Sequence, residues 1–386
     1  MGRKAAGMTE CCDENTQGRA ERLHAAAPSL CRWFAEHARS FPWREKRTPY
    51  KVLVSETMLQ QTRIEAVLRY YERFMTAFPT LAALAQAPED LVMKHWEGLG
   101  YYSRVRNLKR TAEICAERFC GELPETYEAL TKLPGLGSYS AGAVASLCHD
   151  EPVPAVDGNV LRVLSRFFGD ERDVRLPAVR KEAEQVIRLV LNAGISPSLF
   201  NEGLMELGET LCAPKGKPEC GLCPFREACR AHGEGREEML PVRSQGPGRK
   251  TEEKIVWVFL YDGRVALEKR QEKGLLHGLY GFPLTEGVSS DSPETPERTE
   301  DEETASALAH LRAGGITPVT LTPLGRARHI FTHREWRMTG YLVETDAPLP
   351  AYLYVTPEEL EQAYALPSAF RFYRGKALQA CQDRSR

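Results

Sequence analysis

The chain has 386 residues, 27% of them charged and 42% hydrophobic, and its formal net charge is −2. At roughly 100–200 residues per domain, this length predicts two or three domains, each large enough to bury a hydrophobic core. The balanced charge excludes nucleic-acid binding through bulk charge alone, and no run approaches the roughly 18 apolar residues that a membrane helix needs.

Residues 1–22 are polar and show no hydrophobic periodicity, so we expect a disordered tail over residues 1–23. The charges near the start are followed by no apolar stretch, which argues against a secretory signal. The 11 cysteines are an odd number, and without an export signal they favour thiols or a metal site in a reducing compartment over a disulfide framework. We therefore expect a cytoplasmic protein with no membrane partner.

Residues 24–232 carry helical periodicity throughout. Apolar residues over 64–78 and over 105–119 recur three and four positions apart, which predicts one apolar face on each helix. Short stretches rich in Gly and Pro separate these segments, and no strand-like alternation interrupts them. We expect this range to form an all-α domain.

A Leu-Pro-Gly-Leu-Gly segment lies between two expected helices within residues 127–147. Pro ends the first helix, Gly135 and Gly137 allow the backbone to turn, and Ser138 stands at the start of the second helix. The free N–H groups there suit a phosphate oxygen and read no base sequence. Asp157 follows at the start of the next expected helix, where it is either a helix cap or a functional carboxylate.

Four cysteines with the spacing C-x7-C-x2-C-x5-C close the helical range; they are Cys212, Cys220, Cys223 and Cys229. A Cys-x2-Cys step lets two thiolates from one tight turn face the same centre. Structural zinc usually pairs two separated knuckles of this kind, whereas here one knuckle is flanked by two lone cysteines. The pattern favours the corners of a [4Fe-4S] cluster, with a single zinc ion as the alternative.

The composition changes after residue 232. Residues 233–253 combine many charges with several Gly and Pro residues, which is typical of a linker. Residues 254–261 are β-branched and aromatic, and Asp262-Gly263 precedes a second run of this kind. A strand, an Asp-Gly pair and another strand predict a β-hairpin.

Further strands are expected at residues 337–343 and 351–355. Thr356 is followed by Pro and by two Glu residues, a capping box that opens a helix. We therefore expect a mixed α+β domain over residues 254–386 and a multidomain chain.

The hairpin, the carboxylate after it and the four-cysteine loop follow one another over residues 24–232. Their order and spacing resemble the iron–sulfur branch of the helix–hairpin–helix DNA glycosylases. Within this branch, three features resemble the MutY family of adenine DNA glycosylases. Tyr139 stands where endonuclease III-like members carry a Schiff-base Lys, and Pro42-Trp43-Arg44 with residues 54–62 is similar to the MutY signature. Residues 254–386 are similar to the Nudix-like domain of that family.

This resemblance implies a monofunctional DNA glycosylase that initiates base excision repair. It would flip out adenine mispaired with 8-oxoguanine or guanine in double-stranded DNA and hydrolyse its N-glycosyl bond. Glu56 would be the general acid that protonates adenine N7, since its apolar neighbours raise its pKa. Asp157 would stay ionised and face the cationic sugar, electrostatically or as a transient covalent partner. Tyr139 and Asn159 would orient these groups through hydrogen bonds.

The resemblance also implies DNA contacts and a cofactor. Residues expected around the extruded adenine or inside the duplex near the lesion are Trp43, Arg44, Leu59, Gln61, Thr62, Tyr101 and Glu202. Residues expected to read 8-oxoguanine are Phe331, Thr332 (Ser in most of the family) and His333, and those at the DNA backbone are Gly135, Gly137 and Ser138. We further expect one [4Fe-4S] cluster on the four cysteines, and a monomeric bacterial enzyme of the cytoplasm that acts at the nucleoid.

Three other functions stay open at this point. A bifunctional glycosylase and lyase for oxidised pyrimidines is disfavoured, because the phenol of Tyr139 cannot form an imine. A nucleotide pyrophosphohydrolase is disfavoured because residues 302–312 lack the metal-binding Arg-Glu and paired Glu motif of working Nudix enzymes. A catalytically inactive DNA-binding module would need neither Glu56 nor Asp157, and both are present.

Overall fold

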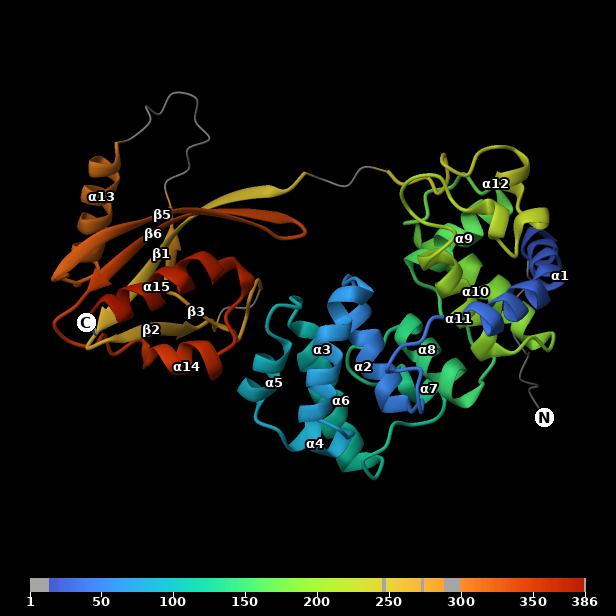
Figure 1. The fold of residues 1–386 in the computed structure, drawn as a ribbon, viewed down its shortest axis with the longest axis horizontal. Helices are drawn as coiled ribbons and strands as arrows, with labels where there is room; N and C mark the ends of the chain where they lie inside the picture. The colour runs from blue at the N-terminus through green and yellow to red at the C-terminus, as the bar shows by residue number, and fades with distance from the viewer. Residues whose placement is uncertain (1–13, 245–247, 272–273, 288–298, 385–386) are drawn as a thin grey trace, which may run out of the picture. The chain divides into compact units, whose positions relative to one another are not determined.

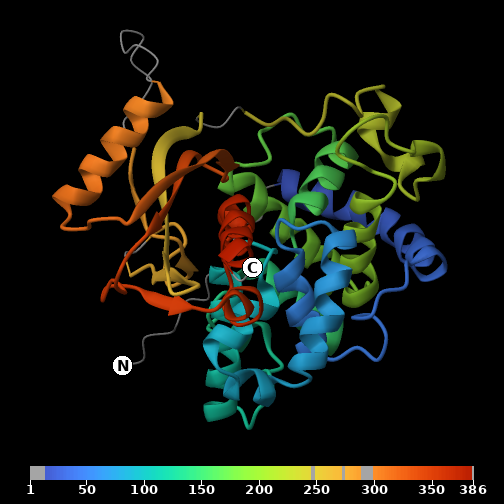
Figure 2. The same cartoon turned by 60° about the vertical axis from the view of Figure 1, so that its left-hand side comes forward.

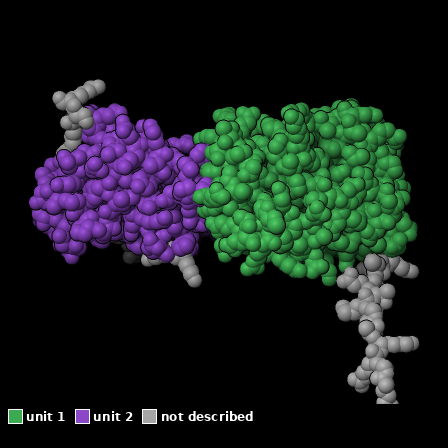
Figure 3. Space-filling view, turned by 90° about the horizontal axis from the view of Figure 1, so that it is seen from below, with its two compact units in different colours: residues 1–86, 107–245 green, residues 87–106, 246–386 purple. Residues whose placement is uncertain are grey.

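The structure is a computed structural model that describes residues 14–244, 248–271, 274–287 and 299–384. The chain divides into two compact units, which Figure 3 colours separately. Unit 1 comprises residues 1–86 and 107–245, and unit 2 comprises residues 87–106 and 246–386. No helix among the described residues is both long enough and apolar enough to span a bilayer.

Unit 1 consists of helices joined by short turns (Figure 1), which confirms the all-α architecture expected for this part of the chain. The first turn of α6 belongs to unit 2. The helices are α1 (Glu14–His37), α2 (Pro49–Leu59), α3 (Ile64–Ala77), α4 (Leu81–Gln86), α6 (Ser103–Arg118), α7 (Tyr127–Leu130), α8 (Ser138–His149), α9 (Gly158–Phe168), α10 (Pro177–Asn192), α11 (Pro197–Glu209), the 3-10 turns η1 (Cys220–Leu222) and η2 (Arg226–Ala228), and α12 (Arg230–Gly233).

Helix α1 begins at Glu14, so the expectation of a disordered tail was wrong for residues 14–23. Residues 1–13 lie outside the described residues. Leu23 is fully buried, and Arg19 pairs with Asp170 and Glu182 at 2.8 and 3.2 Å. The buried side chains of residues 15–23 are Thr16, Ala20 and Leu23, which leave little apolar periodicity in the sequence.

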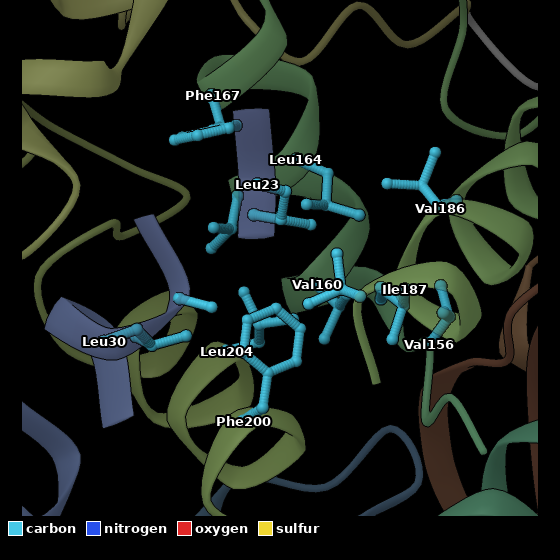
Figure 4. Packing of buried hydrophobic residues seen from close by; sticks show 14 of the residues in the cluster. Leu23, Leu30, Val156, Val160, Leu164, Phe167, Val186, Ile187, Phe200 and Leu204 are labelled. Atoms are coloured by element: carbon cyan, nitrogen blue, oxygen red, sulfur yellow. The ribbon is translucent and has the colours of Figure 1, made fainter. Parts of the chain in front are cut away.

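One hydrophobic core cluster of unit 1 forms where α1, α9, α10 and α11 meet. Figure 4 shows side chains from these helices pointing into one common space; they include Leu23, Leu30, Val160, Leu164, Phe167, Val186, Ile187, Phe200 and Leu204. Because α9 starts directly after Asp157, the packing of α9 also fixes where that carboxylate lies.

Unit 2 contains a seven-stranded mixed sheet with the strand order β3-β2-β1-β6-β5; β4 also pairs with β1, and β7 with β2. Strands β1 and β6 are parallel, and the other pairs are antiparallel. The elements are α5 (Glu89–Trp96), β1 (Lys250–Tyr261), β2 (Arg264–Lys269), β3 (Tyr280–Gly281), β4 (Leu284–Glu286), α13 (Glu300–Ala313), β5 (Thr320–Ile330), β6 (Arg334–Glu344), β7 (Leu353–Val355), α14 (Pro357–Gln362), the 3-10 turn η3 (Ser368–Phe370) and α15 (Arg371–Arg384).

Helices cover both faces of this sheet. Along β1, Val256, Val258 and Leu260 belong to one apolar cluster, and Trp257 and Phe259 belong to another. Residues of α15 join the first cluster and residues of α13 join the second, so the two helices lie on opposite faces of the sheet (Figure 2). Burial on both faces explains why the strand is apolar without alternation.

The sequence predicted most of this sheet. The β1–β2 hairpin around Asp262-Gly263, the strands β6 and β7 and the capping box at Thr356 are confirmed. Strand β1 begins at Lys250, inside the expected linker. Strand β5 was missed because Pro323, Gly325 and several basic residues conceal its pattern, and β3 and β4 are too short to show one.

Helix α5 belongs to unit 2, which the sequence did not indicate. The carboxylate of Glu97 accepts hydrogen bonds from the Leu366 backbone N–H at 3.2 Å and from Arg374 Nη1 at 2.9 Å. Lys94 Nζ donates to the Tyr364 carbonyl at 3.0 Å. These bonds attach residues 87–106 to the end of the chain, whereas we had expected one continuous domain over 24–232.

Candidate active site

A cavity of about 530 Å³ opens into unit 1. Its walls come from the segment before α2, from α2 itself, from α8, from the start of α9 and from α11. It brings together ten of the residues that the sequence singled out: Trp43, Arg44, Glu56, Leu59, Gln61, Thr62, Tyr139, Asp157, Asn159 and Glu202. Residues far apart in the chain thus share one wall of polar groups.

Glu56 lies on α2, which begins after the N-cap Thr48 with Pro49 at its first position. The side chain is buried, and its Oε2 accepts a hydrogen bond from the Tyr139 hydroxyl at 2.5 Å. Burial raises the pKa of Glu56 to about 7; the Tyr139 bond and the charge of Arg44 act against this, and the carboxylates of Asp157 and Glu202 add to it. Near neutral pH the group therefore holds its proton in a substantial fraction of molecules.

Tyr139 is buried beside Glu56 and also lies 3.2 Å from the Met205 sulfur. Burial, followed by the negative charges of Glu56 and Asp157, raises the pKa of this phenol well above its usual range. The hydroxyl is therefore a permanent hydrogen-bond donor, and it is directed at Glu56.

Asp157 is the N-cap of α9, and its Oδ1 accepts the Val160 backbone N–H at 2.7 Å. Burial raises the pKa of Asp157, and so does the nearby carboxylate of Glu209. Hydrogen bonds from the backbone N–H groups of Val160 and Asn159, and the charge of Arg162, lower it. Backbone donors thus favour the ionised form that we expected here, against the effect of burial.

The side chain of Asn159 makes different contacts from those expected. Its Nδ2 donates to Glu209 Oε2 at 3.2 Å, and its Oδ1 accepts from Arg162 Nη2 at 2.8 Å. Only its backbone N–H reaches Asp157. Arg162 in turn donates to the Cys212 carbonyl at 2.9 Å. Asn159 therefore orients Asp157 through its backbone, and its side chain joins the cavity wall to the cysteine loop.

Acidic residues of α11 and arginines of the segment before α2 form a network of ion pairs in the same cavity. Arg44 donates from Nε to Glu202 at 3.1 Å and from Nη2 to Glu206 at 2.9 Å. Arg47 Nη2 donates to Glu202 at 2.6 Å, and Arg39 Nε donates to Glu206 at 2.5 Å. The buried Trp43 stacks on Phe41 next to this network, with ring centroids 4.9 Å apart.

The sequence reasoning missed Arg39, Arg47, Glu206 and Glu209 in this cavity. One signal was available. Glu202, Glu206 and Glu209 are spaced by four and three residues, so they share one face of α11. Nothing in that spacing indicates that the face is turned inward.

The hairpin lies in unit 1 outside this cavity. Gly135 has φ +78°, and a Cβ there would lie 2.6 Å from the Asn107 Cβ. Gly137 is the N-cap of α8, and a Cβ there would meet only open space. The Ser138 hydroxyl donates to Glu184 at 3.2 Å, so the exposed donors at this helix start are backbone N–H groups.

The remaining predicted contact residues gather in unit 2. Tyr101 has φ +48°, is 47% exposed, and its hydroxyl lies 2.6 Å from the Thr332 hydroxyl. Phe331 packs edge-on against Trp336, with ring centroids 4.9 Å apart. The side chain of His333 is exposed, and its carbonyl accepts the Lys250 backbone N–H at 3.1 Å. An aromatic ring and a hydroxyl are thus presented together.

The four cysteines line a second, small cavity in unit 1, together with Arg166, His232 and Glu237. Burial raises the pKa of the Cys220 thiol to about 11 and that of Cys223 to about 12. Arg166 Nη1 donates to the Cys212 sulfur at 3.2 Å. Donor atoms of Cys220, His232 and Glu237 lie within 4.8 Å of one another, whereas no three of the four cysteine sulfurs form such a group in the described part of the chain.

Comparisons with known proteins match both parts of the chain. The family model described as "HhH-GPD superfamily base excision DNA repair protein" matches residues 54–189, and the NUDIX domain model matches residues 255–373. Curated proteins named adenine DNA glycosylase are similar over most of the chain. The Rattus norvegicus protein is 31% identical over 93% of this chain and 80% of its own length. The Homo sapiens protein is 30% identical over 93% and 76%.

The corresponding protein of Buchnera aphidicola subsp. Schizaphis graminum is 34% identical over 68% of this chain and 75% of its own length. Among solved structures, a thermostable thymine-DNA glycosylase is 26% identical, with a TM-score of 0.49, and it covers 57% of this chain and 100% of its own.

Proposed function

Because the chain belongs to the adenine DNA glycosylase family of base excision repair, we propose that it is a monofunctional glycosylase for adenine opposite 8-oxoguanine or guanine in double-stranded DNA. The observation that carries this proposal is the presence of Glu56 and Asp157 in one cavity with different surroundings. Cleaving a glycosidic bond needs an acid for the leaving group and a negative charge for the oxocarbenium-like sugar. Glu56 supplies the acid, and Asp157 supplies the negative charge.

Glu56 protonates adenine N7 as the base departs. Since Oε2 accepts the Tyr139 hydroxyl, the acidic proton is carried by Oε1. After departure the Glu56 carboxylate takes a proton from the attacking water, so the same residue acts as acid and then as base. Tyr139 keeps the carboxyl group oriented through both steps.

Asp157 stabilises the sugar cation. Its position at the N-terminus of α9 gives it two backbone donors, which hold the carboxylate in place. Glu209, bonded to Asn159, adds negative charge on the same side of the cavity. A preorganised negative wall of this kind favours positive charge that develops in the transition state.

The proposal of a monofunctional enzyme rests on the lining of the cavity. Of the described residues that line it, none is Lys, and Tyr139 is a phenol that burial keeps protonated. The described lining of the cavity therefore offers no lysine amine, and a phenol cannot form an imine with the abasic sugar. Hydrolysis is therefore the reaction that this cavity supports.

Recognition of 8-oxoguanine is proposed for the pair formed by Tyr101 and Thr332 in unit 2. Tyr101 is presented by a turn with positive φ as an exposed aromatic ring, which suits insertion between base steps. Thr332 offers a hydroxyl beside it, supported by Phe331. Backbone N–H groups at Gly137 and Ser138 would hold a phosphate.

Replacing Thr332 by Ala is expected to reduce the preference for 8-oxoguanine over guanine opposite adenine by about tenfold, since one hydrogen bond to the lesion is lost. Single-turnover rates on the two duplexes measure the preference. If the ratio of the rates on the A·8-oxoG and A·G duplexes does not change, residues other than Thr332 recognise 8-oxoguanine.

Cys212, Cys220, Cys223 and Cys229 would hold a [4Fe-4S] cluster, which when bound would cross-link the loop around them. A single tetrahedral zinc ion with Zn–S bonds of about 2.3 Å needs sulfurs about 3.8 Å apart. Among the described residues, no three of the four sulfurs lie within 4.8 Å of one another, an arrangement that supports the larger cluster over zinc. Arg166 would donate to the ligand Cys212. We further propose a monomer that acts at the bacterial nucleoid in the cytoplasm.

The test is single-turnover release of adenine from duplexes with A·8-oxoG, A·G and A·C pairs, together with borohydride trapping. We expect release from the first two duplexes, with no strand nick and no trapped adduct. An efficient covalent adduct with a nicked product would refute the monofunctional assignment. Absence of release from every duplex would refute the glycosylase itself.

A further inference from the structure

Glu206 is a buried carboxylate that the proposed reaction does not use. It lies on α11 one turn after Glu202, lines the active-site cavity and is 3% exposed. Oε1 accepts Arg39 Nε at 2.5 Å, and Oε2 accepts Arg44 Nη2 at 2.9 Å. Burial alone would raise the pKa of Glu206, but the two guanidinium groups lower it, so the carboxylate is charged. A buried charge without a partner costs several kcal/mol, and this one has two partners.

Arg44 is held from three directions. Nε donates to Glu202, Nη2 donates to Glu206, and Nη1 donates to the Arg39 carbonyl at 2.7 Å. Its guanidinium carbon also lies 5.2 Å from the Phe34 ring centroid and 5.0 Å from that of Phe41. Glu206 therefore supplies one of the two carboxylates that fix this guanidinium and balance its charge.

Arg44 is the cation that faces the general acid. The charged and titratable groups around Glu56 are Tyr139 from α8, Asp157 from the start of α9, Glu202 from α11 and Arg44 from the segment before α2. Arg44 favours the carboxylate form of Glu56, and Asp157 and Glu202 favour the protonated form. Glu206 contacts Arg44 directly, and Arg44 in turn acts on Glu56.

We propose that Glu206 is a positioning residue for the general acid: it fixes Arg44 and neutralises it, so that Glu56 keeps its proton until the adenine leaves. This inference rests on the proposed function of Glu56. Without the Glu206 charge, Arg44 keeps only Glu202, which it shares with Arg47, so its positive charge is less balanced and favours loss of the Glu56 proton. Because Glu56 and Glu206 are both buried, that effect is larger than at the surface.

Glu206→Gln removes the charge and keeps the size of the side chain. Single-turnover adenine release is measured between about pH 5 and pH 9.5. Because Glu56 must be protonated to act, a lower pKa moves the alkaline limb of the profile to lower pH. We expect a displacement of about one pH unit, about tenfold slower release on the alkaline limb, and a rate within about threefold of wild type on the acidic plateau.

Arg44→Gln provides the opposite change. Removing the guanidinium raises the pKa of Glu56, so the alkaline limb moves to higher pH, although the maximal rate falls because a residue of the adenine wall is lost. The double variant Glu206→Gln/Arg44→Gln is expected to place the limb within about half a pH unit of wild type. If the two single variants move the alkaline limb in opposite directions and the double variant restores it, the charges of Glu206 and Arg44 control the proton of Glu56. A general loss of structure would not produce this pattern.

Asp170→Asn is the matched control. Asp170 is also a buried carboxylate of unit 1 with two arginine partners, Arg19 at 2.8 Å and Arg172 at 2.6 Å, but it does not line the active-site cavity. We expect a lower melting temperature and an unmoved alkaline limb. Melting curves of all variants show which are folded.

Equal slowing of Glu206→Gln at every pH, or an unmoved limb in the folded variant, would overturn the proposal. Should Glu206→Gln not fold, an unmoved limb in Arg44→Gln would overturn it equally. A ¹³C NMR titration of the Glu56 carboxyl, assigned with Glu56→Gln, reads the same displacement without turnover. If wild type releases no adenine, the proposed function fails, and the NMR titration still decides whether Glu206 controls the proton of Glu56.

Discussion

Glu56 and Asp157 carry the same functional group but meet different donors. Glu56 is buried on a helix interior, and its one hydrogen bond in the cavity comes from a side-chain hydroxyl. Asp157 caps a helix and receives backbone N–H groups, which favour the charged form. Burial raises the pKa of both carboxyl groups, but the backbone donors at Asp157 oppose this rise, and only at Asp157 do they favour the charged form that acid-assisted glycosidic cleavage needs beside the acid.

The pH dependence of adenine release tests this assignment. Since burial raises the pKa of Glu56 to about 7, the single-turnover rate should be level below that pH and fall about tenfold per pH unit above it. Glu56→Gln, which has no acidic proton, should release adenine about 10²–10⁴-fold more slowly and lose this alkaline limb. A rate that rises through pH 7 would contradict the role of general acid.

At the scale of elements, short turns place the functional groups. The Gly135 turn ends at Gly137, from which α8 begins, and α8 carries Tyr139 into the cavity two residues later. Helix α11 presents Glu202 and Glu206 on one face. The positions of the reacting groups therefore depend on where helices start and which face they bury.

The two glycines of the hairpin should respond differently to substitution. Gly135→Ala places a Cβ at positive φ and 2.6 Å from Asn107, so we expect a loss of about 1–3 kcal/mol of stability. Gly137→Ala meets open space at φ −77°, so stability should change little, while its methyl group obstructs a phosphate at the helix start. Urea denaturation and DNA-binding assays compare the two. If both variants lose the same free energy of unfolding, the contact between Gly135 and Asn107 is not the reason that a glycine is needed at position 135.

If the four cysteines of the loop hold an iron–sulfur cluster, the purified protein is coloured. Purified wild type should show visible absorbance, with iron and acid-labile sulfide near four per chain. Cys223→Ser should lose most of both and melt at a lower temperature, whereas Cys120→Ser, at an exposed cysteine outside the loop, should lose neither. A colourless wild type with one zinc per chain would refute the cluster.

The two compact units of the whole molecule are not two consecutive stretches of the chain. Residues 87–106 lie between helices of unit 1 in sequence, yet Glu97 binds them to Leu366 and Arg374 near the end of the chain. Tyr101 and Thr332 consequently belong to one unit, although they lie 231 residues apart. Unit 2 therefore includes the exposed ring of Tyr101, although this residue lies far in sequence from residues 246–386.

Glu97→Ala should loosen α5. The Leu366 N–H and Arg374 lose a partly buried partner, so we expect a loss of about 1–3 kcal/mol and faster hydrogen exchange over residues 89–96. Glu89→Ala is the comparison, because Glu89 forms an exposed pair with Arg106 that contributes about 0–1 kcal/mol. Similar exchange in the two variants would argue against a special role for Glu97.

The features that could be predicted from the sequence are local ones. Helical periodicity, the Pro-Gly-Leu-Gly turn, the Asp262-Gly263 hairpin and the spacing of four cysteines each lie within a few residues, and local backbone preferences decide them. The family was inferred from the resemblance of the hairpin, Asp157, Tyr139, the cysteine loop, residues 42–62 and the C-terminal domain to known glycosylases, and the comparisons confirm it. Weakly patterned segments, such as residues 14–23 and β5, were missed because few large apolar residues mark them.

Only the tertiary structure decided which distant groups meet. In the fold, Glu206 points into the cavity and Arg44 bonds to two carboxylates. The Asn159 side chain bonds to Glu209 and Arg162 and to neither of the two reacting carboxyl groups. The fold also joins residues 87–106 to unit 2. These outcomes depend on how helix faces pack against one another, and the spacing of residues within a single helix carries no information about its neighbours. The length that predicted two or three domains could not show that residues 87–106 belong to the same unit as residues 246–386.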